Sequence, residues 1–159
     1  MEGKVLEVNN LTKTYGSKGF QTKVLKGISL SICERDFIAI MGPSGSGKTT
    51  LLNMLSTIDK PTHGSVILDG KDITKIHNKE LSKIRRDKVG FIFQDYNLID
   101  SLKVIDNILF SLKLNKKNII NEAEIKQIIS SLGIEELLDK YPFECSGGQQ
   151  QRIAIARAL

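Results

Sequence analysis

The chain has 159 residues, of which 40% are hydrophobic and 26% are charged, and its formal net charge is +5. This length suits one globular domain rather than two, and the composition excludes bulk disorder. The longest apolar run, Phe37–Met41, is far shorter than the ~20 residues of a membrane-spanning helix, and the N-terminal sequence lacks the layout of a secretory signal.

The first third of the chain is expected to form strands. Val5–Val8 and Val24–Ile32 show the alternation typical of strands, although it is imperfect in the second segment. Phe37–Met41 is instead short and continuously apolar, which favours a strand buried on both faces of a parallel sheet. It is followed by glycines and then by Thr49–Ser56, whose apolar residues have helical spacing. A strand, a glycine turn and a helix in succession open an α/β unit.

Between that strand and that helix, Gly42–Thr49 matches the pattern G-x-x-x-x-G-K-[ST] in full. Its three glycines allow a tight loop whose backbone N–H groups converge on an anion. Lys48 would place its charge between β- and γ-phosphates, and the helix would present its N-terminus to them. The Thr49 hydroxyl is suited to ligating Mg²⁺. The pattern predicts a nucleoside triphosphate site but does not separate kinases, GTPases, helicases and transporter ATPases.

The middle of the chain is predicted to alternate between short strands and a helix. Val66–Leu68 has the composition of a strand, and Val89–Phe93 has that of a second buried strand, which ends at Gln94. Between them, Asn78 is suited to capping a helix that runs to about Arg86.

The densest basic run, Lys83–Lys88, lies at the end of that predicted helix. Cations suit the C-terminal end of a helix, and no aromatic residue is interleaved, so we interpret the run as solvated helix surface. The alternative is a contact with phosphate or anionic lipid. We expect no nucleic-acid partner.

The second half of the chain is predicted to be mostly helical. Apolar residues recur at three- and four-residue spacing in two stretches, and Gly133 is placed to end the second of them. The apolar positions are Leu102, Ile105, Ile108, Leu109 and Leu112 in the first stretch and Ile125, Ile128, Ile129 and Leu132 in the second.

A last helix is predicted to begin at Ser146, because Ser146 and Gln149 have capping-box spacing. Two glycines in its first turn would let a ligand approach the backbone closely, which makes this a second helix N-terminus suited to an anion. The helical pattern still continues at Leu159, and a parallel sheet should continue after it. We therefore expect a chain that is truncated at its C-terminus.

With both motifs present, the chain resembles the first two-thirds of an ATP-binding cassette (ABC) domain over essentially its whole length. Gly42–Thr50 matches the Walker A loop and Ser146–Gln149 matches the signature motif. Gln94 matches the Q-loop glutamine, and Tyr15 matches the aromatic residue that stacks on adenine. Segments such as Gly90–Ile99 resemble the bacterial exporter branch, whose members handle macrolides, lipoproteins and antimicrobial peptides such as bacitracin.

The resemblance implies an α/β P-loop NTPase fold of the ABC type. This fold has antiparallel N-terminal strands, a parallel core sheet, here incomplete, and a helical subdomain. It would divide the chain into a nucleotide-binding core at residues 1–93, a helical subdomain at 94–145 and the signature helix at 146–159.

The resemblance also implies which residues bind nucleotide. ATP would lie between two cassettes, with the P-loop of one facing the signature serine and glycines of the other. Thr49 and Gln94 would ligate Mg²⁺, and only Lys48 and Gln94 would take part in catalysis. The implied nucleotide-binding residues are Tyr15, Gly42, Pro43, Ser44, Gly45, Ser46, Gly47, Lys48, Thr49, Thr50 and Gln94, and, across the dimer, Ser146, Gly147, Gly148 and Gln149.

Departures from the family pattern bear on activity. The Walker B strand, with its Mg²⁺-binding Asp and catalytic Glu, would follow the signature helix, as would the switch histidine, and neither is found in this sequence. His63 and His77 precede the signature motif and cannot replace that histidine. Cys145 stands where leucine is usual. We therefore expect the 159-residue chain to bind ATP without sustaining its hydrolysis.

The implied function is that of the ATP-binding subunit of an ABC transporter, which couples ATP binding and hydrolysis to export across a membrane. Its implied partners are a second ATPase subunit in a head-to-tail dimer and a transmembrane permease. The permease would dock on Asp95–Ile99 and the helices after it.

The expected location is the cytoplasmic face of the cell membrane. Cys33 and Cys145 are far apart and form no CxxC pair, which fits a reducing compartment. One alternative is a soluble ABC-type ATPase of translation, repair or cell division, against which the compact stretch between Gln94 and Ser146 argues. The other alternative is a non-functional, truncated remnant.

Overall fold

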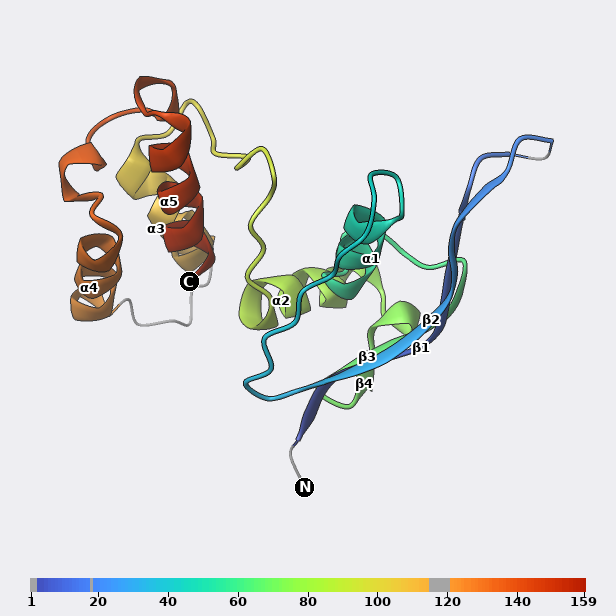
Figure 1. The fold of residues 1–159 in the computed structure, drawn as a ribbon. Coiled ribbons are helices and arrows are strands. Elements are labelled where there is room, and N and C mark those ends of the chain that lie inside the picture. The colour runs from blue at the N-terminus through green and yellow to red at the C-terminus, as the bar shows by residue number, and fades with distance from the viewer. Residues whose placement is uncertain (1–2, 18, 115–120) are drawn as a thin grey trace. The chain divides into compact units, whose positions relative to one another are not determined.

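The computed structural model describes residues 3–17, 19–114 and 121–159 (Figure 1). The chain divides into two compact units, Met1–Asp87 and Lys88–Leu159. Each unit has a hydrophobic core of its own, and the buried residues of each core come from that unit alone. In the described part of the chain, no helix combines the length and the apolar character that crossing a bilayer requires.

Four antiparallel strands form the sheet of the first unit, in the order β2-β1-β3-β4. Their bounds are β1 (Lys4–Tyr15), β2 (Thr22–Cys33), β3 (His63–Leu68) and β4 (Lys71–Asp72), which confirms the three strands predicted in these regions. β1 pairs with β2 as far as Tyr15, but with β3 only as far as Thr12. The end of the β1–β2 hairpin therefore extends past β3 (Figure 1).

Helices cover one face of that sheet and close the first core. They are α1 (Lys48–Leu55), the 3-10 turn η1 (Ile73–Lys75) and α2 (Asn78–Lys88). Apolar residues of the sheet, such as Val8, Leu11 and Val66, share the core with Met54 of α1 and Leu81 of α2.

The start of α2 differs by one residue from the prediction. The backbone N–H of Leu81 donates to the carbonyl of His77, at 3.0 Å, so His77 and not Asn78 occupies the capping position. Asn78 is the first helical residue instead.

The two predicted buried strands are not strands in this structure. Phe37–Met41 and Val89–Phe93 carry no regular secondary structure, and Phe37 and Met41 are 98% and 88% exposed. A strand exists through hydrogen bonds to neighbouring strands, and no described residue forms a parallel pair with either segment. Gly90 lies against the end of the last helix instead, where a Cβ would be 2.5 Å from the Ala158 carbonyl oxygen.

The second unit is helical, as predicted. Its α-helices are α3 (Val104–Leu114), α4 (Glu122–Leu132) and α5 (Gly147–Ala158), and its 3-10 turns are η2 (Glu135–Leu137) and η3 (Pro142–Glu144). Gly133 ends α4 in a left-handed conformation, with φ 58°, which confirms the predicted cap. The core of this unit includes Val104, Ile108, Ile129, Ile134, Leu137, Cys145, Ile153 and Ala156.

The two cysteines differ in their surroundings. Cys33 ends β2 and is half-buried, whereas Cys145 is buried in the core of the second unit. The Cys145 thiol donates to the Tyr141 carbonyl at 3.5 Å, and burial raises the pKa of this thiol.

Candidate nucleotide-binding site

The predicted phosphate loop runs directly into α1 in the first unit. Gly47 is the N-cap of α1 and has φ 92°, a left-handed conformation that favours glycine. A Cβ on Gly47 would lie 3.0 Å from side-chain atoms of both Leu25 and Val24. At Gly42, a Cβ would lie 2.9 Å from the Ser46 hydroxyl. Glycine at these two positions keeps the loop tight and leaves its backbone accessible.

The start of α1 has the properties of an anion site. No described side chain caps it by a hydrogen bond, and its first turn contains no acidic residue. The first N–H groups of a helix have no partner within the helix, and they carry the positive end of its dipole. Residues 42–46 are exposed, so a phosphate group could reach these N–H groups. The loop and helix therefore fit a polyphosphate.

Lys48, the first residue of α1, folds back over the loop. Its ammonium group donates to the carbonyl oxygens of Gly42, at 2.9 Å, and Pro43, at 2.8 Å. An ammonium group has three N–H donors, and these two neutral acceptors use two of them. Two neutral carbonyl oxygens thus hold the Lys48 ammonium group at the loop, in a position suited to phosphate oxygens.

Tyr15 lies at the end of β1 and is 42% exposed. Its hydroxyl donates to one carboxylate oxygen of Asp59 at 2.7 Å, and it lies close enough to Thr50, in the first turn of α1, for that side chain to act on the Tyr15 pKa. The structure therefore brings the predicted adenine-stacking residue to the phosphate-loop helix. Sequence patterns could not have placed Asp59 here, because it lies 44 positions along the chain from Tyr15.

Lys13 completes this cluster. Its ammonium group donates to the other carboxylate oxygen of Asp59, at 2.8 Å, and lies 4.7 Å from the centroid of the Tyr15 ring. Burial raises the pKa of Tyr15, and the hydrogen bond to Asp59 raises it further. Burial alone would raise the pKa of Asp59, but hydrogen bonds from Lys13 and Tyr15 outweigh it and lower that pKa.

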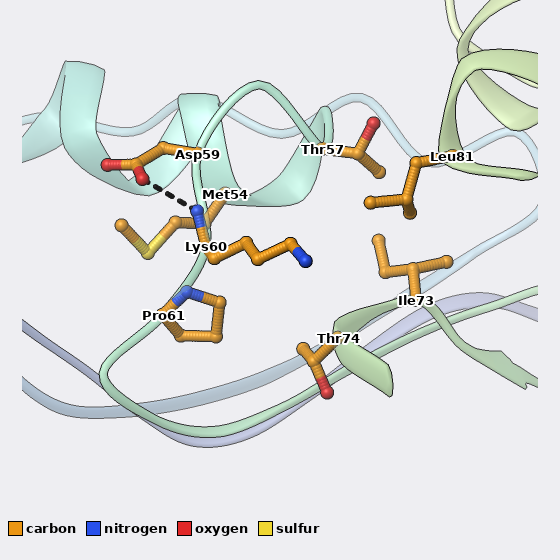
Figure 2. A pocket seen from close by; sticks show the side chains of 8 residues that line it. All are labelled: Met54, Thr57, Asp59, Lys60, Pro61, Ile73, Thr74 and Leu81. Carbon is orange, nitrogen blue, oxygen red and sulfur yellow. Dashed lines mark hydrogen bonds between the residues drawn. The ribbon is translucent and has the colours of Figure 1, made fainter. Parts of the chain in front are cut away.

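A shallow pocket lies beside this cluster (Figure 2). Its lining is mainly apolar, and it is open to solvent. No phosphate-loop residue lines this pocket, so we do not assign the nucleotide to it. The lining residues are Met54, Thr57, Asp59, Lys60, Pro61, Ile73, Thr74 and Leu81.

In the second unit, the predicted capping box at the start of α5 is confirmed. The Ser146 hydroxyl accepts from the Gln149 N–H at 3.4 Å, and the Gln149 side chain accepts from the Ser146 N–H at 2.8 Å. Gly147 and Gly148 are exposed, and a Cβ on Gly148 would meet nothing within 4 Å. The first turn of α5 is therefore open to an approaching ligand.

Gln94 is exposed in a turn of the second unit, ahead of a segment with unusual backbone conformations. Tyr96 and Asn97 both have positive φ, 58° and 48°. Arg157, near the end of α5, donates to the Tyr96 carbonyl at 2.7 Å and to the Asn97 carbonyl at 2.5 Å. The segment after Gln94 is thus fastened to the same helix that begins at the signature motif.

Asn107 in α3 holds the next part of the segment. Its side chain is fully buried, accepts from the Ile99 N–H at 2.7 Å, and donates to the carbonyls of Ile99, Leu102 and Lys103 at 3.0–3.2 Å. Sequence reasoning missed the contacts of both residues: Asn107 belongs to no recognisable motif, and Arg157 lies in the helical run after the signature motif, where its sequence position does not show which carbonyls it meets.

The predicted metal ligands, Thr49 and Gln94, lie in different units. Across the described residues, no group of three or more His, Cys, Asp and Glu side chains is arranged to hold a metal ion.

Comparison with known proteins decides the family. The family profile described as "ABC transporter" matches residues 25–159. The chain belongs to the ABC transporter family. This ABC chain is 48% identical, over 98% of its length, to the bacitracin export ATP-binding protein BceA of Halalkalibacterium halodurans. It is 44% identical to the macrolide export ATP-binding/permease protein MacB of Campylobacter fetus, of which it covers 24%.

Solved structures support the same family fold. The cassette MJ0796 of Methanocaldococcus jannaschii, solved as a dimer, superposes with a TM-score of 0.88 at 42% identity. The match covers 97% of this ABC chain and 68% of that one. A second structure of MJ0796, bound to ADP and Pi, superposes with a TM-score of 0.87. The chain spans about 60% of the length of relatives such as BceA, 62%, and YxdL of Bacillus subtilis, 60%.

Proposed function

We propose that this chain is the ATP-binding part of an ABC exporter and binds Mg-ATP in its first unit. One observation carries the proposal: a glycine loop leads into an uncapped helix N-terminus, with Lys48 held over the loop by backbone carbonyls alone. Tyr15, which lies near Thr50 of the same helix, supplies an aromatic ring beside that loop.

The roles of the individual residues follow from the geometry. N–H groups of residues 42–49 would hold the β- and γ-phosphates, and Lys48 would exchange its carbonyl partners for phosphate oxygens. The Tyr15 ring would stack on adenine. Thr49 and Gln94 would ligate Mg²⁺, which neutralises phosphate charge when it is bound.

The signature helix would act on the nucleotide of a second subunit. Ser146, Gly147, Gly148 and Gln149 offer a hydroxyl and exposed backbone at the start of α5. The related cassette MJ0796 was solved as a dimer, which supports the pairing of two such chains, and we propose that they pair head to tail. ATP would then be held by the phosphate loop of one subunit and the signature motif of the other.

We further propose that these 159 residues do not sustain hydrolysis by themselves. Phosphoryl transfer to water needs a group that positions and deprotonates that water, and such groups contribute roughly 10²–10⁴-fold. Asp95 and Glu144 are the carboxylates nearest in sequence to the motifs, and both are exposed. The Glu144 carboxylate already accepts from the Tyr141 N–H at 2.6 Å.

The transporter context rests on the relatives. Two of them, BceA and MacB, are named for export of bacitracin and macrolides. We propose that a permease docks on Asp95–Ile99 and the helical second unit, on the cytoplasmic face of the membrane. The attachment of this segment to α5 through Arg157 would couple the docking surface to the signature helix.

Nucleotide titration tests the proposal. Lys48→Ala should weaken Mg-ATP binding about ten- to a hundredfold, because charge-assisted hydrogen bonds contribute about 1.5–3 kcal/mol. Lys71→Ala is the matched control, because it removes an exposed lysine that is paired with Glu80 in the same unit. A Lys48→Ala chain that binds ATP as well as the parent would rule out the assignment.

Turnover tests the second part. The purified 159-residue chain should release phosphate at the background rate with or without Lys48. Steady hydrolysis that disappears in Lys48→Ala would show that a carboxylate within these residues serves the water.

A further inference from the structure

Three side chains at the end of the β1–β2 hairpin form a closed arrangement. Asp59 accepts from Lys13 with one carboxylate oxygen, at 2.8 Å, and from the Tyr15 hydroxyl with the other, at 2.7 Å. Lys13 and Tyr15 also contact each other directly, ammonium to ring, at 4.7 Å from the centroid. Each member therefore touches both of the others.

Lys13 makes the two faces of the Tyr15 ring different. Its side chain is only 12% exposed, although it lies near the end of a hairpin. A cation within about 6 Å of a ring centroid is attracted to the ring face. The ammonium group therefore occupies one face of Tyr15, which leaves the other face for a flat ligand.

Asp59 is itself fixed to the helix that begins at the phosphate loop. The N–H groups of Ile58 and Asp59 donate to the Asn53 carbonyl in α1, at 2.8 and 3.0 Å. The Asp59 carboxylate accepts from the Lys60 N–H at 2.7 Å, a bond visible at the edge of the pocket in Figure 2. Tyr15 is thus tied through Asp59 to the chain that follows α1, and its side chain lies near Thr50 in the first turn of that helix.

We propose that Lys13 and Asp59 are positioning residues that present one face of the Tyr15 ring to a nucleobase, at a distance from the phosphate loop set by α1. This inference rests on the proposed ATP-binding function. Without the two residues, the Tyr15 ring can adopt several orientations. Ordering the ring when a nucleobase binds would then cost conformational entropy and weaken binding.

A purely stabilising role explains the arrangement less well. The Lys13–Asp59 ion pair and the bond from Lys13 to the Lys60 carbonyl, at 2.6 Å, would stabilise the fold without Tyr15. The hydrogen bond to Tyr15 and the contact of Lys13 with the ring act on the orientation of one exposed aromatic side chain. Their effect should appear in ligand binding more than in stability.

The test compares ATP with inorganic tripolyphosphate, which has no base, by calorimetric titration of the 159-residue chain. Asp59→Ala and Lys13→Met should each weaken ATP about three- to tenfold and leave tripolyphosphate within about twofold. Tyr15→Ala should cause the largest base-selective loss, about tenfold or more, since base–aromatic stacking contributes about 1–3 kcal/mol. Asp59→Asn, which keeps an acceptor for the Tyr15 hydroxyl, should retain most of the ATP affinity.

Tyr15→Phe keeps the ring and removes its bond to Asp59. It should match Asp59→Ala, and the double variant should be no weaker than either single variant, because both remove the same interaction. Glu80→Ala is the control, since it breaks the exposed Lys71–Glu80 pair of the same unit and should leave both ligands unaffected. Additive losses in the double variant would overturn the inference.

The outcomes separate this inference from the function on which it rests. Base-selective loss in Tyr15→Ala, with none in Asp59→Ala, Lys13→Met and Tyr15→Phe, would overturn the positioning role alone. Equal losses for ATP and tripolyphosphate in Tyr15→Ala would overturn the role of Tyr15 as a base platform. If Asp59→Ala does not fold, the conservative Tyr15→Phe and Lys13→Met variants decide between these outcomes.

Discussion

Gly64 occupies a position in β3 that only glycine tolerates. Its φ is 92°, and a Cβ there would lie 2.5 Å from the Asn10 carbonyl oxygen and 2.6 Å from that of Asn9. These two residues lie where the pairing of β1 with β3 shifts register. We expect Gly64→Ala to lower the free energy of unfolding of the first unit by about 2–5 kcal/mol, the sum of left-handed strain and overpacking.

Gly70 provides the matched control for this substitution. It also has positive φ, 74°, but a Cβ there meets nothing within 4 Å. Gly70→Ala should therefore cost only the backbone strain, about 1–2 kcal/mol. Urea denaturation followed by circular dichroism compares the two, and equal losses would show that the close approach of β1 to Gly64 relaxes at no cost.

The pKa of Asp59 predicts a pH dependence of stability. This pKa is lowered because hydrogen bonds from Lys13 and Tyr15 outweigh burial, so the folded state favours the carboxylate. The stabilisation is fully present above the unfolded-state pKa, about 3.9, and is lost as pH falls through the lower folded-state pKa. The stability difference between the parent and Asp59→Asn should be constant from about pH 7 to 5 and shrink below about pH 4.

Urea titrations of both proteins at several pH values measure that difference. Asp72→Asn is a useful comparison, because the pKa of Asp72 is also lowered, by its bonds to Thr74 and Lys75 against an opposing effect of burial. A difference for Asp59 that is as large at pH 3 as at pH 7 would contradict the prediction.

At the scale of elements, α5 controls the segment that follows Gln94. Arg157→Met would remove both donors to the carbonyls of Tyr96 and Asn97, while keeping the apolar part of the side chain. Backbone N–H groups of that segment should exchange with solvent about ten- to a hundredfold faster, as expected for losing charge-assisted bonds of about 1.5–3 kcal/mol. Hydrogen exchange with mass spectrometry measures this.

Arg152 lies on the same helix and is exposed, so Arg152→Met is the control and should leave exchange in residues 95–99 unchanged. Unchanged exchange in Arg157→Met as well would mean that Asn107 alone fixes the segment.

Elements were predictable from sequence where their cause is local. The capping box of Ser146 and Gln149 and the left-handed end of α4 at Gly133 depend on residues within a few positions of each other. The prediction of a strand at Phe37–Met41 was wrong. A strand forms only where a neighbouring strand offers hydrogen-bond partners, and apolar composition does not show whether such a neighbour is present. The phosphate loop was found for the same local reason as the caps, whereas the Lys13–Asp59 contact joins residues 46 positions apart.

At the scale of the whole chain, the presence of two separate cores predicts that a core substitution destabilises only the unit that carries it. Leu11 belongs to the core of the first unit and Ile134 to that of the second, and both are fully buried. Leu11→Ala and Ile134→Ala should each cost about 2–5 kcal/mol in their own unit. Amide exchange should accelerate in the unit that carries the substitution and stay near the parent value in the other. Acceleration in both units would show that they unfold as one.

Because Cys145 is buried, its rate of alkylation can report how often the second unit opens. A thiol reagent meets the half-buried Cys33 from solvent but reaches Cys145 only when the second unit opens, and its raised pKa keeps it protonated and slow to react. Two alkylation phases should follow, and the slower one times the opening of the core beside Ser146. Ser146 begins the signature motif. The slower phase therefore measures, without any introduced label, how often the core next to the start of α5 opens.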